Sequence, residues 1–145
     1  MNKIFEHILV PYNGCPGSQK AFKKSVELAK VTQSKITIFT CLEERSTFGF
    51  FKTKTSKQEF EKEHKLVREE HVKLEKNAEN QGVSLNSKII KSNMASESIL
   101  EFAEKHDVDL IVMGLKKQTR HEKIYYPSTI EAVFKNFQGA ILVLN

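Results

Sequence analysis

The sequence contains few cysteines and no long apolar run. Cys15 and Cys41 are its two cysteines, and their spacing matches no metal-binding motif. Each stands where a small hydrophobic residue would serve, so we expect both thiols to be reduced and structural. The N-terminal residues 1–10 mix Glu6 and His7 with apolar residues, and therefore have neither a signal-peptide core nor a membrane-length run. We expect a cytoplasmic protein that makes no contact with a membrane.

Motifs of hydrolases and phosphotransferases are also missing. The sequence has no Walker lysine motif, no nucleophile elbow, no spaced metal ligands and no convincing pair of acids. Asp107 and Asp109 flank the start of a predicted strand, at the end opposite to the candidate site derived below. We therefore expect a protein that is not an enzyme.

A strong charge of one sign is absent as well. The formal net charge is +5 and the pI is near 9.1. Basic residues are spread along the chain and alternate with acids, as they do in residues 62–70. This pattern is typical of a solvated helix face, so we do not expect a nucleic-acid partner. The exception is a local cluster of basic residues after Gly114.

Apolar runs alternate with helical patterns along the whole chain, which at 145 residues is long enough for one domain. The runs predict strands at residues 7–12, 36–42, 83–90, 108–113 and 140–144. Helical periodicity predicts helices at residues 18–32, 56–80, 94–106 and 128–138. This alternation predicts right-handed βαβ units and a parallel sheet that helices cover on both faces. The fold class is therefore α/β, a doubly wound sheet in a single domain.

Three helix starts are predicted from residues that can cap a helix. Ser18 precedes the first helical pattern. Ser56 with Glu59, and Ser128 with Glu131, have the spacing of capping boxes. We expect these three serines to stand at the N-termini of their helices.

Two histidines, His64 and His71, lie on the apolar stripe of the second predicted helix. A pair on one face can bind a metal or respond to pH. They are separated by seven residues, however, which is about 10 Å along a helix. We therefore expect partly buried, hydrogen-bonded histidines.

The candidate site follows from the predicted sheet. In doubly wound sheets, ligands bind at the C-terminal ends of the strands, where the winding direction reverses. These ends are residues 12–18, 41–43 and 113–129. The last segment runs from an apolar strand through Gly114 to a helix start at Ser128. Such a segment is typical of an anion site, because the N–H groups at a helix N-terminus have no partners within the helix.

The segment Phe48 to Phe51 contains three aromatic residues among polar ones. Two interpretations are open. The aromatic residues form a lid or contact surface if they are exposed, or they pack onto the edge of the sheet.

Two segments resemble the universal stress protein family. The run ILVPYNGCPGS at residues 8–18 is similar to the family's first strand and its Pro-x-Asp-Gly-Ser turn. The run DLIVMG at residues 109–114 is similar to its fourth strand. The resemblance covers nearly the whole chain and implies one universal stress protein domain over residues 1–145. It also implies a five-stranded parallel sheet of order 3-2-1-4-5, of flavodoxin-like or adenine nucleotide alpha hydrolase-like winding.

The resemblance implies AMP or ATP as a ligand, because many members of the family bind one of them; neither is required as a cofactor. The adenine would lie by Pro11, Tyr12 and Asn13 and near Cys41. Asn13 stands where the family usually has an acid. Asparagine keeps an acceptor oxygen and adds N–H donors, so the contacts to base or ribose change their pattern.

The phosphate segment departs further from the family pattern. ATP-binding members carry Gly-x2-Gly-x9-Gly followed by Ser or Thr. Counted from Gly114, the next two glycine positions hold Lys117 and Pro127, and the hydroxyl position holds Ser128. Lysine has a Cβ that restricts positive φ, and proline has no N–H. The usual backbone cradle for phosphates therefore cannot form unchanged.

Basic side chains in the same segment offer a replacement. Lys116, Lys117 and Arg120 can supply charge in place of the lost backbone donors, and a helix N-terminus persists at Ser128 and Thr129. The alternatives are a solvated surface loop and a nucleic-acid contact. The expected nucleotide-binding residues are Pro11, Tyr12, Asn13, Cys41, Met113, Gly114, Lys116, Lys117, Arg120, Ser128 and Thr129.

Two functional hypotheses remain. The first is a nucleotide-binding module that acts in the stress response as a homodimer. The second is a member of the family's non-ATP-binding branch, which acts through protein–protein interaction and has a degenerate phosphate loop. The family usually dimerises through its last strand. We therefore expect a homodimer through Ala140 to Leu144, an apolar edge that is otherwise open to aggregation.

Overall fold

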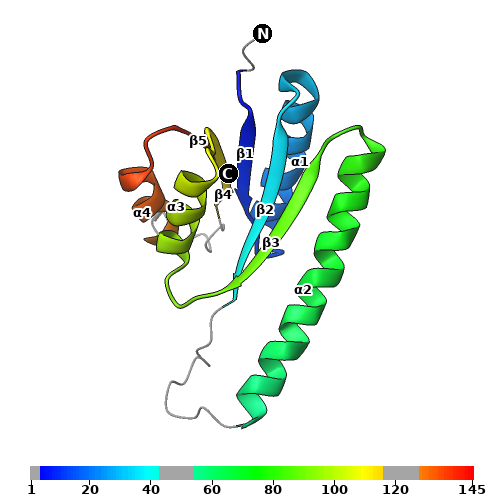
Figure 1. Cartoon of the computed structure of the whole chain (residues 1–145), viewed down its shortest axis with the longest axis vertical. Coiled ribbons are helices and arrows are strands. Elements are labelled where there is room, and N and C mark those ends of the chain that lie inside the picture. The colour runs from blue at the N-terminus through cyan, green and yellow to red at the C-terminus, as the bar shows by residue number, and fades with distance from the viewer. Residues whose placement is uncertain (1–3, 43–53, 116–127) are drawn as a thin grey trace.

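The computed structural model describes residues 4–42, 54–115 and 128–145. Within these ranges, parallel strands form one sheet in the order β3-β2-β1-β4-β5 (Figure 1). In chain order the elements are β1 His7–Pro11, α1 Pro16–Thr32, β2 Lys35–Leu42, α2 Lys54–Asn80, β3 Leu85–Lys91, α3 Ala95–Lys105, β4 Leu110–Gly114, α4 Ser128–Asn136 and β5 Ala140–Leu144. The predicted α/β fold and its strand order are confirmed.

The central strand β1 is buried on both of its faces. Ile8, Leu9 and Val10 have no exposed surface. Because side chains alternate along a strand, Ile8 and Val10 pack into the cluster formed with α1 and α2, whereas Leu9 packs into the cluster formed with α3 and α4. The helices therefore cover the sheet in two pairs, one pair on each face (Figure 1). This double burial explains why β1 lacks polar alternation.

The third strand, β3, is more polar than the others because it lies at an edge of the sheet. Three consecutive residues in the middle of β3, Asn86, Ser87 and Lys88, are exposed. The opposite edge is β5. In chain order, α2 connects β2 to β3. It is a helix of 27 residues that extends well beyond the C-terminal ends of the strands (Figure 1).

Two of the predicted helix caps are wrong. Helix α1 begins at Pro16 with Cys15 as its N-cap, so Ser18 lies inside the helix. Proline is favoured at the first helical position because its fixed φ suits a helix and its missing N–H would have no partner there. Helix α2 begins at Lys54, ahead of Ser56, since lysine is itself a good helix former. Helix α4 does begin at Ser128, whose side chain lies outside the described part of the chain.

Two glycines allow α1 and β4 to touch through their backbones. A Cβ placed on Gly114 would lie 1.9 Å from the carbonyl oxygen of Gly17. A Cβ placed on Gly17 would lie 2.6 Å from the carbonyl oxygen of Leu115. Both obstacles are backbone atoms, so neither contact can be relieved by turning a side chain. The packing of α1 against β4 therefore requires Gly114, whatever ligand the nearby cavity holds.

We expect Gly114→Ala to lower the free energy of unfolding by about 3 kcal/mol, because the new methyl group separates α1 from β4. Gly82→Ala is the matched control. Gly82 has φ +76°, and a Cβ added to it would meet no atom within 4 Å, so the loss of stability there reflects backbone strain alone. That strain costs about 1 kcal/mol. Urea denaturation measures both variants, and equal losses would contradict the packing argument.

Candidate functional site

A cavity of about 300 Å³ lies at the C-terminal edge of the sheet. The ends of β1, β2 and β4 and the starts of α1, α3 and α4 form its walls. Its lining residues are Pro11, Tyr12, Asn13, Cys15, Ser18, Phe39, Cys41, Ala95, Ile99, Met113, Gly114, Thr129 and Ile130. This is the edge at which doubly wound sheets bind ligands.

Seven of the expected nucleotide-binding residues come together in this cavity. They are Pro11, Tyr12, Asn13, Cys41, Met113, Gly114 and Thr129. Lys116, Lys117 and Arg120 lie outside the described residues, as does Phe48 to Phe51, and Ser128 is described only by its backbone at the start of α4. The role of these residues in binding a nucleotide stays a prediction.

Sequence reasoning missed the apolar wall of the cavity. Phe39 projects from β2, Ala95 and Ile99 belong to α3, and Ile130 belongs to α4. Apolar periodicity marks these residues as core, and three of them are in fact buried in the cluster under α3 and α4. Nothing in the pattern distinguishes a core residue that borders a cavity from one that does not.

The side chain of Asn13 is bonded to the turn that begins α1. Its Oδ1 accepts hydrogen bonds from the Cys15 N–H at 3.1 Å and from the Ser18 hydroxyl at 3.0 Å. Ser18 itself is buried, which explains why its hydroxyl turns back toward this turn. The acceptor oxygen that was expected to face base or ribose is therefore used within the protein. Asn13 offers a ligand the N–H donors of its exposed amide group.

Cys15 is the N-cap residue of α1, but its thiol makes no capping hydrogen bond and instead donates one to the Ser18 hydroxyl at 3.7 Å. Burial raises the pKa of this thiol, but the polar groups of Ser18, Gly17 and Asn13 favour the thiolate and bring the pKa below its ordinary value. Cys15 and Cys41 are not joined in a disulfide. The N-terminus of α4 also borders the cavity, and a helix N-terminus favours an anion.

Tyr12 connects the wall of the cavity to α2. Its hydroxyl donates a hydrogen bond to Glu70 Oε1 at 2.8 Å, and its carbonyl oxygen accepts one from Thr40 Oγ1 at 2.7 Å. Burial and the Glu70 carboxylate raise the pKa of Tyr12 well above its usual value. Tyr12 therefore remains a neutral phenol at physiological pH, and its hydroxyl hydrogen is used in the bond to Glu70.

The two histidines of α2 have different environments. His71 is wholly buried, and its Nε2 lies 2.7 Å from Thr40 Oγ1, which confirms the expected hydrogen bond. His64 is half-buried beside Phe60, at 6.4 Å between ring centroids. Among the described side chains, no cluster of three or more His, Cys, Asp or Glu residues could hold a metal ion. Nor is any described helix long and apolar enough to cross a membrane.

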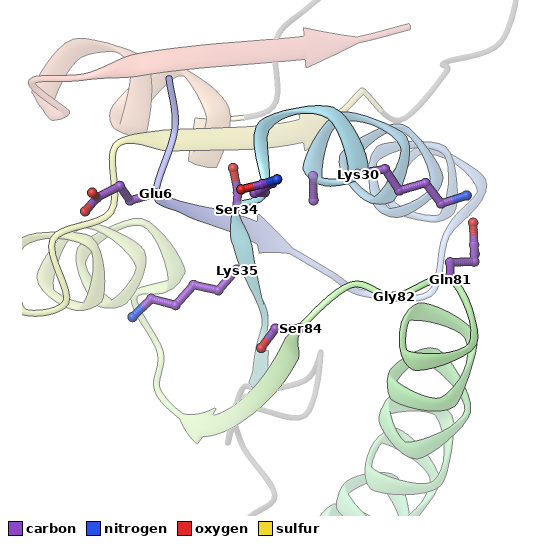
Figure 2. Close-up of a pocket in the computed structure, with 9 residues that line it drawn as sticks. Glu6, Lys30, Ser34, Lys35, Gln81, Gly82 and Ser84 are labelled. Carbon is purple, nitrogen blue, oxygen red and sulfur yellow. The ribbon is translucent and has the colours of Figure 1, made fainter. Parts of the chain in front are cut away.

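A second cavity, of about 590 Å³, lies at the N-terminal ends of the strands, between the C-terminal turns of α1 and α2. Lys30, Lys35 and Glu6 are its charged residues, and all three are exposed. Figure 2 shows that Lys30 and Lys35 extend in opposite directions. Although this cavity is larger, its charged groups do not converge on a ligand, so the cavity at the C-terminal edge is the better candidate site.

Comparisons with known proteins agree with this fold. The model of the universal stress protein family matches residues 4–145. A universal stress protein of Methanocaldococcus jannaschii is 30% identical over 145 residues, which cover 97% of this chain and 82% of that protein. Among solved structures, UspA from Lactobacillus plantarum is similar, with 18% identity, a TM-score of 0.82 and coverage of 99% and 100% of the two chains. A family member from Burkholderia pseudomallei has 16% identity, a TM-score of 0.77 and coverage of 99% and 98%. The chain therefore belongs to the universal stress protein family.

Proposed function

We propose that this universal stress protein binds an adenine nucleotide, AMP or ATP, at the C-terminal edge of its sheet, and that it acts by binding and not by catalysis. The observation that carries this proposal is the convergence of seven expected binding residues on one cavity. Further support comes from two relatives with the same fold. A universal stress protein from Archaeoglobus fulgidus, 11% identical with a TM-score of 0.63, is in complex with dAMP. A second universal stress protein, 14% identical to this chain with a TM-score of 0.69, is in complex with cAMP.

The size and lining of the cavity favour a nucleoside unit. A volume of about 300 Å³ is at the lower end of the range for small-molecule sites. Met113, Ile99 and Ile130 supply apolar surface for a base, and the Asn13 amide group supplies hydrogen-bond donors for its acceptor atoms. We therefore infer that adenine and ribose occupy the cavity, and that the phosphates extend toward the first turn of α4.

We expect calorimetry to detect binding of AMP or ATP, and we expect Ala95→Phe to weaken it at least about tenfold, because the new ring fills the cavity. Ser96→Phe is the matched control, since Ser96 is the next residue of α3, is equally half-buried and does not line the cavity. Circular dichroism verifies that all proteins are folded. If folded wild type binds none of AMP, ADP and ATP at millimolar concentration, the proposal is wrong.

A second candidate is a universal stress protein that binds no nucleotide and acts through protein–protein interaction. Two observations favour it. The close backbone contact with Gly17 already explains why residue 114 is a glycine, so the presence of Gly114 is no evidence of a phosphate site. The Asn13 oxygen is also bonded within the protein, so it is not open to a base or ribose. An adenine nucleotide that stays bound through purification and appears in native mass spectrometry would exclude this candidate.

We further propose that two copies of the chain pair through β5. This strand lies at an edge of the sheet, Ala140 is exposed, and the other four residues are only half-buried. An apolar edge strand of this kind leaves backbone N–H and C=O groups open to a second strand. When two copies pair antiparallel about a two-fold axis, their β5 strands hydrogen-bond these backbone groups to each other, and the assembly stops at a dimer.

Light scattering at micromolar concentration should therefore give the mass of a dimer. Ala140→Lys is expected to shift the protein toward monomer, because it brings two added positive charges into the paired edges. Val31→Lys is the control, since Val31 is 80% exposed on α1, away from β5. A wild type that is entirely monomeric would show that this pairing does not occur.

A further inference from the structure

Three groups that lie outside the cavity hold Tyr12 in place. Glu70 accepts a hydrogen bond from the Tyr12 hydroxyl, and Thr40 donates one to the Tyr12 carbonyl oxygen. The ring of His71 meets the ring of Tyr12 edge to face, at 6.3 Å between centroids and an interplanar angle of 71°. Tyr12 itself borders the cavity, whereas Glu70, Thr40 and His71 do not. Helix α2 thus controls one wall of the cavity without contacting a ligand there.

The hydrogen bonds determine where the proton of His71 lies. Thr40 has one hydroxyl hydrogen, and the Tyr12 carbonyl oxygen can only accept, so that hydrogen points to Tyr12. Thr40 Oγ1 must therefore accept its second hydrogen bond, at 2.7 Å, from an N–H at His71 Nε2. The neutral ring then carries no hydrogen on Nδ1. Among the described residues Nδ1 has no hydrogen-bond partner, and the side chain is 1% exposed.

A proton added to Nδ1 would have an unfavourable position. It would create a buried charge and an N–H donor that lacks an acceptor among the described residues. The cost would act where His71 contacts Thr40 and Tyr12, next to the second link from α2, the hydrogen bond between Tyr12 and Glu70. Protonation of His71 therefore favours a state in which α2 has moved away from the ends of β1 and β2.

The surroundings of His71 decide how strongly its ring resists protonation. Burial lowers the pKa of His71 below its ordinary value of 6.5, although Glu70 and Glu75 of the same helix act in the opposite direction. From β1 and β2 the ring faces Tyr12 and Thr40, which are uncharged. On β3, the Ser87 hydroxyl donates a hydrogen bond to the Glu75 carboxylate at 2.6 Å. The charged residues of β3 are Lys88 and Lys91, and both are exposed.

We propose that His71 is a positioning residue for the cavity: its neutral form holds Thr40 and Tyr12 in the arrangement that binds a ligand, and its protonation releases them, which links binding to pH. The identity of the ligand rests on the proposed function. The link between His71 and Tyr12 does not, because it exists in the protein without a ligand.

The sign of the pH effect follows from the lowered pKa. The folded state prefers the neutral ring, so His71 contributes stability above the unfolded pKa of 6.5, and this contribution is lost as the pH falls through the lower pKa of the folded state. The arrangement of Thr40 and Tyr12 that binds a ligand is likewise more stable when the His71 ring is neutral. Affinity therefore falls with decreasing pH, by up to about tenfold per pH unit once the ring titrates.

The test measures adenosine binding by calorimetry from about pH 7.5 down to the lowest pH at which circular dichroism shows a folded protein. Adenosine is the probe because it has no phosphate group to titrate in this range. In the wild type, affinity should decline toward low pH. In His71→Gln, whose side-chain N–H can still bond to Thr40, affinity at about pH 7.5 should stay within about twofold of wild type and its decline should disappear. A decline that is unchanged in His71→Gln would overturn the proposal.

His64→Gln is the matched control, because it makes the same substitution on the same helix at a half-buried histidine that contacts Phe60 instead of Tyr12. It should keep the pH dependence of the wild type. Loss of the pH dependence in both variants would mean that the effect does not come from His71 and would refute the inference.

A measurement on the free protein separates this inference from the proposed function. The ring resonances of Tyr12 should shift in NMR spectra with the same midpoint as the titration of His71, and they should not shift in His71→Gln. Tyr12 resonances that are insensitive to the titration of His71 would refute the inference. If adenosine does not bind to the wild type at about pH 7.5 while Tyr12 follows His71, the proposed nucleotide ligand is wrong and the positioning role of His71 stands.

Discussion

The backbone contact between Gly17 and Gly114 determines how the rest of the cavity is arranged. It brings the first turn of α1 directly onto the end of β4. Asn13 and Cys15 precede that turn, so the same contact decides where their side chains lie relative to Met113 and Gly114. Because no side chain stands between the two backbones, the position of α1 cannot adjust by a change of rotamer. The first turn of α1 and the end of β4 therefore form one fixed frame at the cavity.

Within this frame, hydrogen bonds inside the protein use several groups that a ligand would otherwise contact. The Asn13 oxygen accepts hydrogen bonds in the turn before α1, and the Tyr12 hydroxyl donates one to Glu70. What remains for a ligand is a cavity with apolar walls, donors on Asn13 and the N-terminus of α4. This distribution is the basis for proposing a nucleoside site in a chain that lacks two of the phosphate-loop glycines.

Much of the architecture follows from burial patterns that are visible in the sequence. Ile8, Leu9 and Val10 show no polar alternation because they are buried on both faces of the sheet, and residues 86–88 are polar because β3 lies at an edge. These patterns report how deeply each residue is buried. The helix starts were harder to predict, since Ser18 is a typical capping residue and yet lies inside α1. Several residues near a helix start can begin it, and the choice depends on contacts such as the one between Ser18 and Asn13.

The sequence by itself determined the class of fold, the family and the edge of the sheet at which residues such as Asn13 and Met113 meet, because periodic burial and chain order leave few other arrangements. Only the tertiary structure decided what those residues do there. It paired Gly17 with Gly114, bonded the Asn13 oxygen to Ser18, and joined His71 to Tyr12 through Thr40. These are contacts between backbone and polar groups whose partners depend on distance and direction in three dimensions, and hydrophobic periodicity carries no record of either.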